Sequence, residues 1–421
     1  MKRSFLLAVA FLSVAALVAG PARARAEREV RIGVILPLTG AAAATGIELK
    51  HASELAADVV NTAMKDLPLP LAASAGLPRL GHAKIRLIFA DHQGSPQIGA
   101  SEAERLITQE HVAALTGCYF SAVTATASQV AERYGIPFLN SDSTSTTLTQ
   151  RGFKWFFRTT PADDLFVRNF FEFLKDVEAR KHVSVKTLAL FNENTLWGSE
   201  TTKLEEELAK KNGYTVAEKV LYPAKSTQLT SEVQRIAAAH ADVVMQSSYL
   251  GDAILAMNTY RDLGYTPAAL LANDAGFNDT EFLKSEGKYG DGILSRETWA
   301  LDLAAHKPLI KKVNDLLEAR YHVSFTGNSA RDFTGILTLA DAIDRAGSTK
   351  PAAIRKALEQ TNIPGDRIIM PWKGIKFDAK GQNELGTGIM VQVQHGKYVT
   401  VWPFDLASAD VVWPMVPWSR R

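Results

Sequence analysis

Cysteine is almost absent from this chain: Cys118 is the only one among 421 residues, so no internal disulfide forms. In "LTGCYF" we expect it in packed structure. An excess of one charge is lacking too, since the net charge is +2. Residues 1–26 contain four basic residues and no acid, so the rest of the chain carries −2. This balance argues against nucleic acid or an anionic membrane surface as the partner.

Motifs of common catalytic sites are missing as well. The chain has no G-x-x-x-x-G-K-[ST], G-x-G-x-x-G, H-E-x-x-H or G-x-S-x-G pattern. Its nine histidines form no pair at the i, i+3 or i, i+4 spacing that presents two metal ligands on a helix. We therefore expect no enzyme activity, metal or cofactor, and binding of a ligand becomes the leading class. A triad assembled from distant residues leaves a secreted hydrolase as an alternative.

Only one long apolar run occurs, at the N-terminus. Lys2 and Arg3 precede the run from Phe5 to Gly20, and Ala24-Arg25-Ala26 follows as a small-x-small cleavage pattern. This order predicts a secretory signal peptide over residues 1–26. The run is shorter than the ~20 residues that a membrane-spanning helix needs. The remaining chain is expected to be an exported, soluble protein.

Strand-like and helix-like segments alternate along the rest of the chain, in two successive units. In the first unit we expect strands at 30–38, 84–92, 112–117 and 136–141, with helices around 52–63, 101–109 and 125–134. In the second we expect strands at 186–194, 214–222, 241–249 and 268–274, with helices at 200–212, 229–240 and 252–263. A helix at 330–346, a hairpin at 388–402 and a surface insertion at 64–82 complete the prediction. Strands separated by such helices predict parallel sheets covered on both faces, and the length favours two domains.

Polar and aromatic residues stand where the predicted strands end. Residues 137–152, "PFLNSDSTSTTLTQRG", place seven hydroxyl side chains within nine positions directly after a strand. In the second unit, Trp197, Tyr249 and Asp274 follow strands. Each has an ordinary explanation, as a helix cap, a turn or a core residue. Ligands of open α/β sheets bind beyond the carboxyl ends of strands, however, so together these side chains predict a cleft for a small zwitterion.

The chemistry of such a cleft can be assigned to residue types. Hydroxyls and free backbone N–H groups at helix starts, such as Ser121, would hold a ligand carboxylate. Asp274 would accept from an ammonium group. Trp197 and Tyr249 would cover the cation or an apolar side chain.

Over essentially all of its length after residue 26, the chain resembles the Leu/Ile/Val-binding family of periplasmic solute-binding proteins of ABC transporters. The resemblance is carried by an ordered series of segments: "RIGVILPLTGAAAATG", "ELAADVVN", "GIPFLNSDSTSTTLTQRGFKWFFRTTP", "NENTLWGSE", "YRDLGY", "AND" and "AIDRAGSTKPAAIRKAL". It implies a periplasmic receptor, expected as a monomer, that delivers a small amino-acid-like solute to a membrane permease. A sensory ligand-binding domain is a lesser alternative.

The resemblance also implies an α/β fold of the type I periplasmic-binding class, with two lobes joined by three hinge crossings. Lobe I would comprise 27–157 and 302–370, and lobe II would comprise 158–301 and 371–421. The crossings are expected near Arg158, near Trp299–Leu301 and near Pro371–Phe377.

The family's site positions transfer to particular residues. Its carboxylate-binding positions fall on Ser121, Asp142, Ser143 and Thr144, and its lobe II contacts fall on Trp197, Tyr249 and Asp274. Three positions depart from the family. Asp142 stands where small residues are common, so it either repels a simple carboxylate or recruits another donor. Thr45 replaces a frequent aromatic, and Trp197 replaces a usual Tyr. A urea, amide or aromatic-acid solute therefore stays open beside a branched-chain amino acid.

Overall fold

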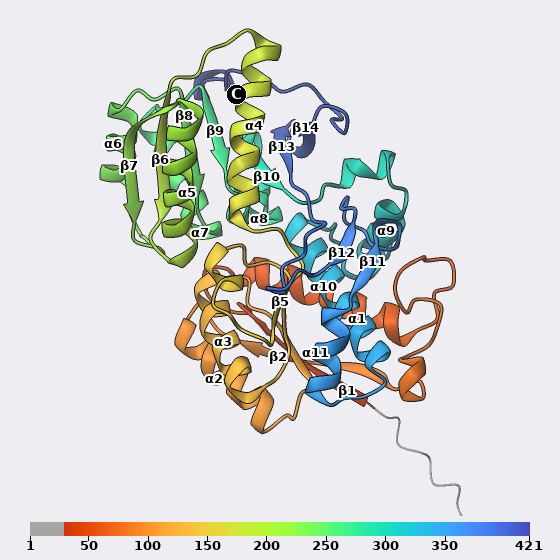
Figure 1. The fold of residues 1–421 in the computed structure, drawn as a ribbon. Coiled ribbons are helices and arrows are strands. Elements are labelled where there is room, and N and C mark those ends of the chain that lie inside the picture. The colour runs from red at the N-terminus through yellow and green to blue at the C-terminus, as the bar shows by residue number, and fades with distance from the viewer. Residues whose placement is uncertain (1–28) are drawn as a thin grey trace, which may run out of the picture.

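Two separate sheets organise residues 29–421, the part of the chain that this computed structural model describes. Figure 1 shows them in two lobes, one above the other, joined near the middle of the molecule. The predicted signal peptide, residues 1–26, lies outside the described residues. The prediction of an α/β fold, with mainly parallel sheets flanked by helices, is confirmed.

The first sheet is fully parallel, in the order β2-β1-β3-β4-β5. Its strands are β1 (Glu29–Leu36), β2 (Lys84–Asp91), β3 (Ala114–Gly117), β4 (Phe138–Asn140) and β5 (Phe156–Arg158). The helices packed on it are α1 (Ala43–Asn61), α2 (Pro96–Thr108), α3 (Ser121–Tyr134) and α10 (Gly327–Ala346), with α9 (Leu309–Tyr321) and α11 (Pro351–Glu359) beside them. Alternate residues of β1 face opposite sides. Val34 and Leu36 join the core under α1 and α10, whereas Ile35 joins the core under α2 and α3.

The second sheet has the order β14-β13-β10-β9-β8-β6-β7. Its parallel strands are β6 (Thr187–Glu193), β7 (Thr215–Tyr222), β8 (Val243–Ser247), β9 (Ala269–Ala272) and β10 (Leu294–Glu297). The predicted hairpin is confirmed as β13 (Ile389–Gln394) and β14 (Lys397–Trp402), which join antiparallel to β10. The helices around this sheet are α4 (Asp163–Lys181), α5 (Leu196–Asn212), α6 (Thr230–Ala238), α7 (Leu250–Asp262) and α8 (Thr280–Glu286). A small separate sheet pairs β11 (Asn362–Pro364) with β12 (Gly374–Lys376).

Some elements were not expected from the sequence. Helix α4 precedes the first strand predicted for the second unit, and it buries Phe166, Phe170 and Val177 on one face. Strand β10 was not predicted, because two of its four residues, Arg296 and Glu297, are charged. All four residues are nevertheless buried. Helices α9 and α11 were also missed.

The insertion at 64–82 precedes β2, as predicted, but it is more than a surface loop. Leu69, Ala72 and Leu77 are buried in the core that includes α1 and α10. The backbone N–H of Arg79 also donates to Asp344 at the end of α10, at 2.8 Å.

Where the two lobes join, hydrogen bonds connect β5 with the segment 381–383. The backbone N–H of Arg158 donates to the carbonyl of Gly381 at 2.7 Å, and the N–H of Asn383 donates to the carbonyl of Arg158 at 2.9 Å. The buried Arg158 guanidinium reaches Gln382 at 2.6 Å and the carbonyl of Ser145 at 2.7 Å. The exact lobe boundaries and hinge crossings stay predictions.

Candidate functional site

The carboxyl ends of strands from both sheets meet around one small cavity of about 20 Å³. Twelve residues line it: Tyr119, Ser121, Asp142, Ser143, Thr144, Trp197, Tyr249, Asp274, Ala275, Arg296, Asn328 and Arg331. Seven of the eight residues predicted from the sequence as ligand contacts are among them. The structure thus brings these seven together, and their role in binding stays a prediction.

Thr45, the eighth predicted residue, does not line this cavity. It lies in the first turn of α1, and its hydroxyl donates to the Asp279 carboxylate at the start of α8. Because α1 packs on the first sheet and α8 belongs with the second, this bond joins the two lobes. Burial raises the pKa of Asp279 above its usual value, against the Thr45 hydrogen bond.

The backbone is strained on both sides of the cavity. Gly117, Cys118 and Tyr119 have φ angles of 102°, 80° and 59°, and Asp274 and Ala275 have 58° and 50°. Positive φ is uncommon for residues other than glycine, and such strain gathers at functional sites. These loops follow β3 and β9, and each turns a side chain, Tyr119 or Asp274, into the cavity.

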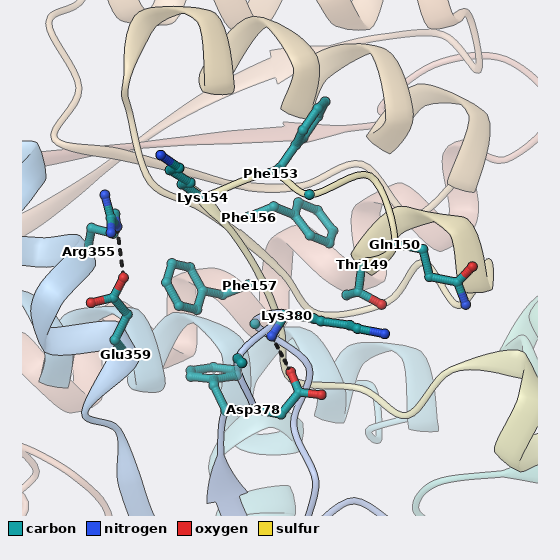
Figure 2. Close-up of a pocket in the computed structure, with 14 residues that line it drawn as sticks. Thr149, Gln150, Phe153, Lys154, Phe156, Phe157, Arg355, Glu359, Asp378 and Lys380 are labelled. Carbon is teal, nitrogen blue, oxygen red and sulfur yellow. Dashed lines mark hydrogen bonds and ion pairs between the residues drawn. The ribbon is translucent and has the colours of Figure 1, made fainter.

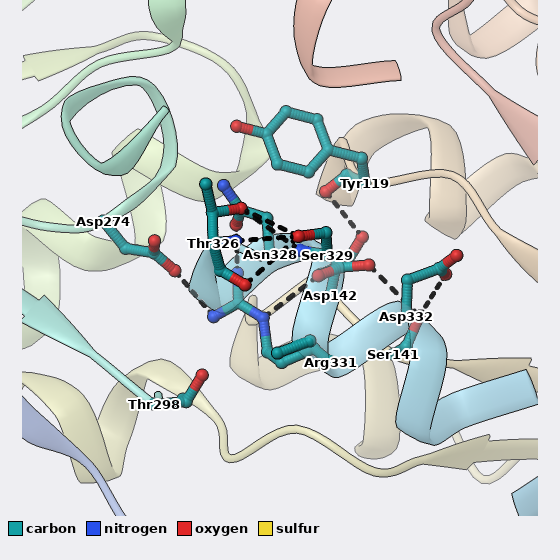
Figure 3. Close-up of polar contacts among 12 residues, drawn as sticks. Tyr119, Ser141, Asp142, Asp274, Thr298, Thr326, Asn328, Ser329, Arg331 and Asp332 are labelled. Atoms are coloured by element: carbon teal, nitrogen blue, oxygen red, sulfur yellow. Dashed lines mark hydrogen bonds and ion pairs between the residues drawn. The ribbon is translucent and has the colours of Figure 1, made fainter. Parts of the chain in front are cut away.

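Arg331 is the central group of the site, and Figure 3 shows its guanidinium between Asp142 and Asp274. It donates to Asp142 at 3.0 Å and to Asp274 at 2.7 Å, and it also donates to the side-chain oxygen of Asn328. Arg331 lies in the first turns of α10 and is 1% exposed. It connects the loop after β4, in the first sheet, with the loop after β9, in the second. Of the two possibilities that Asp142 raised, recruitment of a donor is therefore the one found.

A second guanidinium, that of Arg296, donates to the same oxygen of Asp274 as Arg331 does. Arg296 donates to Asp274 at 2.8 Å and to Asn273 at 2.6 Å, and its guanidinium lies 3.8 Å from the centre of the Phe166 ring. Burial alone would raise the pKa of Asp274, but Arg331 and Arg296 together hold it below its usual value. Asp274 is accordingly an ionised carboxylate shared by two cations.

Burial dominates at the other carboxyl groups near the cavity. It raises the pKa of Asp142 to about 6, although Arg331 opposes the shift. It also raises the pKa of Asp332, which accepts from Ser141 at 2.9 Å, to about 7. Glu297 rises to about 7 through burial and the nearby negative charge of Asp274. Burial thus favours the protonated form of these three carboxyl groups.

Three hydrogen-bond donors that line the cavity have no partner among the described residues. They are the hydroxyl of Tyr119, which is 5% exposed, the side-chain N–H₂ of Asn328, which is fully buried, and the indole N–H of Trp197, which is 2% exposed. The Trp197 indole faces the buried Asp163, whose pKa it acts to lower against the effect of burial. The donors of Tyr119 and Asn328 are therefore the ones left for a ligand.

The hydroxyl-rich segment 137–152 divides between several tasks. Ser143 donates to the carbonyl of Tyr119 at 2.9 Å and lies 2.6 Å from the Thr124 hydroxyl, so its side chain shapes the loop. The hydroxyls of Ser145 and Thr147 donate to the Glu200 carboxylate of α5, and the bond from Thr147 is 2.7 Å long. These two bonds are a further contact between the lobes. The many hydroxyls of this loop thus organise its backbone and join it to the second lobe.

A much larger cavity, of about 690 Å³, lies beside β5 and α11 (Figure 2). Three of its charged groups are engaged with their neighbours: Arg355 donates to Glu359 at 2.8 Å, and Asp378 accepts from the backbone N–H of Lys380 at 2.8 Å. None of its lining residues within 29–421 carries a buried polar side-chain atom without a partner. Size alone therefore does not make it the better candidate.

The sequence prediction missed Tyr119, Arg296, Asn328 and Arg331 as residues of the site. Tyr119 stands two residues after the predicted strand at 112–117 and could have been included on that ground. Arg331 gives no local signal, because it is 189 residues from Asp142 and 57 from Asp274 in the sequence.

Neither a metal-binding cluster nor a membrane-spanning helix is found among the described residues. Within residues 29–421, no three His, Cys, Asp or Glu side chains come together in a way that could hold a metal ion. No helix in that range has both the length and the apolar composition needed to cross a membrane.

Comparison with known proteins places the chain among solute-binding proteins. Residues 29–397 match the family described as "Periplasmic binding protein". Leu/Ile/Val-binding protein homolog 8 of Brucella suis is 29% identical over 424 residues, covering 98% of this chain and 99% of that protein, and homolog 7 of the same organism is 28% identical over 413 residues, covering 96% and 98%.

Solved structures show the same fold. The leucine-binding protein LivK of Thermotoga maritima has a TM-score of 0.74 at 22% identity, covering 88% of this chain and 97% of that one. The branched-chain amino acid binding protein LivJ of Streptococcus pneumoniae, in complex with isoleucine, has a TM-score of 0.73 at 20% identity, covering 92% and 100%.

Proposed function

The chain belongs to the periplasmic binding protein family, and we propose that it is the substrate-binding component of an ABC importer. It captures a small amino-acid-like solute between its two lobes and delivers it to a membrane permease. It acts in the periplasm, as a monomer, after removal of residues 1–26, and it has no catalytic step.

The observation that carries this proposal is the cavity between the strand ends of the two sheets. Its walls come from both sheets, and Arg331, Thr45 and Glu200 make hydrogen bonds from one lobe to the other around it. A space of about 20 Å³ holds roughly one water molecule. A solute therefore enters when the lobes separate, and closure around it replaces some of these contacts with contacts to the solute.

The relatives narrow the class of solute. Their names refer to leucine, isoleucine and valine, and the Streptococcus pneumoniae structure contains isoleucine. Amino-acid-like solutes with a branched side chain are therefore the first to test, ahead of ureas, amides and aromatic acids. A secreted hydrolase has less support, because the site places two guanidiniums against carboxylates rather than a nucleophile beside a base.

Thermal unfolding of the purified chain with a panel of solutes tests the proposal. A solute at 100 times its Kd stabilises the folded chain by about 2.7 kcal/mol, which appears as a clear rise in Tm. The panel comprises amino acids, their 2-oxo acids, aromatic acids, amides and ureas. NMR of a solute that binds, after long incubation, separates a receptor from an enzyme: we expect it unchanged. No rise in Tm across the panel would contradict the proposal.

A further inference from the structure

The hydrogen-bond acceptors in the cavity wall are already engaged. Both oxygens of Asp274 and the side-chain oxygen of Asn328 accept hydrogen bonds. Asp142 accepts from Arg331 on Oδ1, and its Oδ2 shares the single Ser141 hydroxyl proton with Asp332. Arg331 donates to Asp142, Asp274 and Asn328. A group on a ligand that can only donate, such as an ammonium, meets no free carboxylate among the described residues that line the cavity.

Some hydrogen-bond donors in the cavity wall, in contrast, have no partner. The Tyr119 hydroxyl and the Asn328 N–H₂ group are buried, line the cavity and have no partner within residues 29–421. Ser121 begins α3, so the first backbone N–H groups of a 14-residue helix lie at the same cavity. Buried donors without partners cost free energy, and a ligand oxygen that accepts from them removes that cost.

An ammonium group bound at Oδ2 of Asp274 would have to displace a guanidinium, because Arg296 and Arg331 both donate to this oxygen. Arg296 is held in place by Asn273 and by the Phe166 ring, so Arg331 would have to leave. That would remove one of the two carboxylate partners of a buried cation, which is a costly change in a protein interior. A carboxylate or keto oxygen requires no such exchange.

From this imbalance we propose that the solute is a small organic acid without an ammonium group, such as a 2-oxo acid, bound through its oxygens to Tyr119, Asn328 and the start of α3. This inference rests on the proposed function as a solute receptor and specifies its substrate class. Arg331 then serves as the protein's own cation at Asp274, in the place that an amino acid's ammonium would take.

Matched pairs of ligands test the proposal directly. Leucine and 4-methyl-2-oxopentanoate share a side chain and a carboxylate and differ only in the amine or keto group, as do phenylalanine and phenylpyruvate. Titration calorimetry of the purified chain is expected to show at least about tenfold tighter binding of the oxo acid in a pair that binds. Tighter binding of the amino acid overturns this inference and leaves the receptor function standing. If no solute of any class binds, the receptor function itself fails.

A variant gives a second, independent test. Asn328→Asp keeps an oxygen for Arg331 to donate to but loses the unpartnered N–H₂ group. We expect its affinity for the oxo acid to fall by about tenfold or more, with the Tm of the free protein maintained. Unchanged affinity for the oxo acid in Asn328→Asp would overturn the assignment. If the variant does not fold, the matched ligands still decide the question.

Discussion

The hydroxyl of Tyr119 allows a substitution whose effects on folding and on binding have opposite signs. In Tyr119→Phe only this oxygen is lost, and the ring keeps its contact with Tyr249, whose centre lies 5.6 Å away. Because the hydroxyl is buried without a partner, its removal breaks no hydrogen bond of the protein. An unpaired buried polar group costs about 1–3 kcal/mol, so we expect the free energy of unfolding to stay the same or rise by about 1 kcal/mol.

Binding should respond in the other direction. If the hydroxyl donates to a ligand carboxylate, the lost bond is worth about 1.5–3 kcal/mol. This corresponds to roughly a 10- to 150-fold increase in Kd. Titration calorimetry with the best solute of the panel measures this, and urea unfolding without solute measures the change in stability.

Tyr265→Phe is the matched control. The Tyr265 hydroxyl is also buried without a partner, but it packs against Tyr260 in the second lobe and does not line the cavity. Both variants should be at least as stable as the parent, and only Tyr119→Phe should bind weakly. A Kd for Tyr119→Phe within twofold of the parent value would refute the argument from unpartnered donors.

Three further predictions concern buried charged groups. Glu297 has its pKa raised from 4.5 to about 7, so between these pH values the folded chain keeps a proton that the unfolded chain has lost. The free energy of unfolding should therefore fall as pH rises from 4.5 to 7, by on the order of 3 kcal/mol at most. Urea unfolding measured as a function of pH should show a smaller fall in Glu297→Gln. A Cβ at Gly327 would collide with the buried Glu297 carboxylate, so Gly327→Ala should displace that side chain and lower the Tm; an unchanged Tm would contradict this. Asp274→Asn removes the charge shared by Arg331 and Arg296 and should lower the free energy of unfolding by about 3–5 kcal/mol, and a loss below about 1 kcal/mol would show that the two guanidiniums find other partners.

Asp274 shows how the structure changes an interpretation based on residue type. A lone acid after a predicted strand suggested an acceptor for a ligand's ammonium group. The side chain does line the cavity, but two arginines already donate to its Oδ2, and Asn278 donates to its Oδ1. Its substitution therefore tests the stability of the closed site more directly than it tests ligand specificity.

The periodicity of apolar residues by itself determined most of the fold. The run ending at Leu36 predicts β1, and similar runs predict β6 and β8, because a strand covered on both faces is continuously apolar. Helices between such strands imply parallel sheets, and this in turn places the following loops at one edge. Seven of the eight predicted site residues accordingly line one cavity.

Only the tertiary structure decided which charges meet in that cavity. Arg331 and Arg296 are ordinary charged residues in a helix and a strand, and nothing beside them in the sequence indicates a partner. The partners of Arg331 come from loops of two different sheets, so its pairing depends on how the lobes close, whereas Arg296 pairs within the second lobe. Secondary structure follows from local patterns, whereas hydrogen-bond satisfaction in a cleft depends on groups far apart in the chain. For this reason the sequence predicted a binding site at these strand ends, and only the tertiary structure supplied the hydrogen-bond argument behind the proposed class of solute.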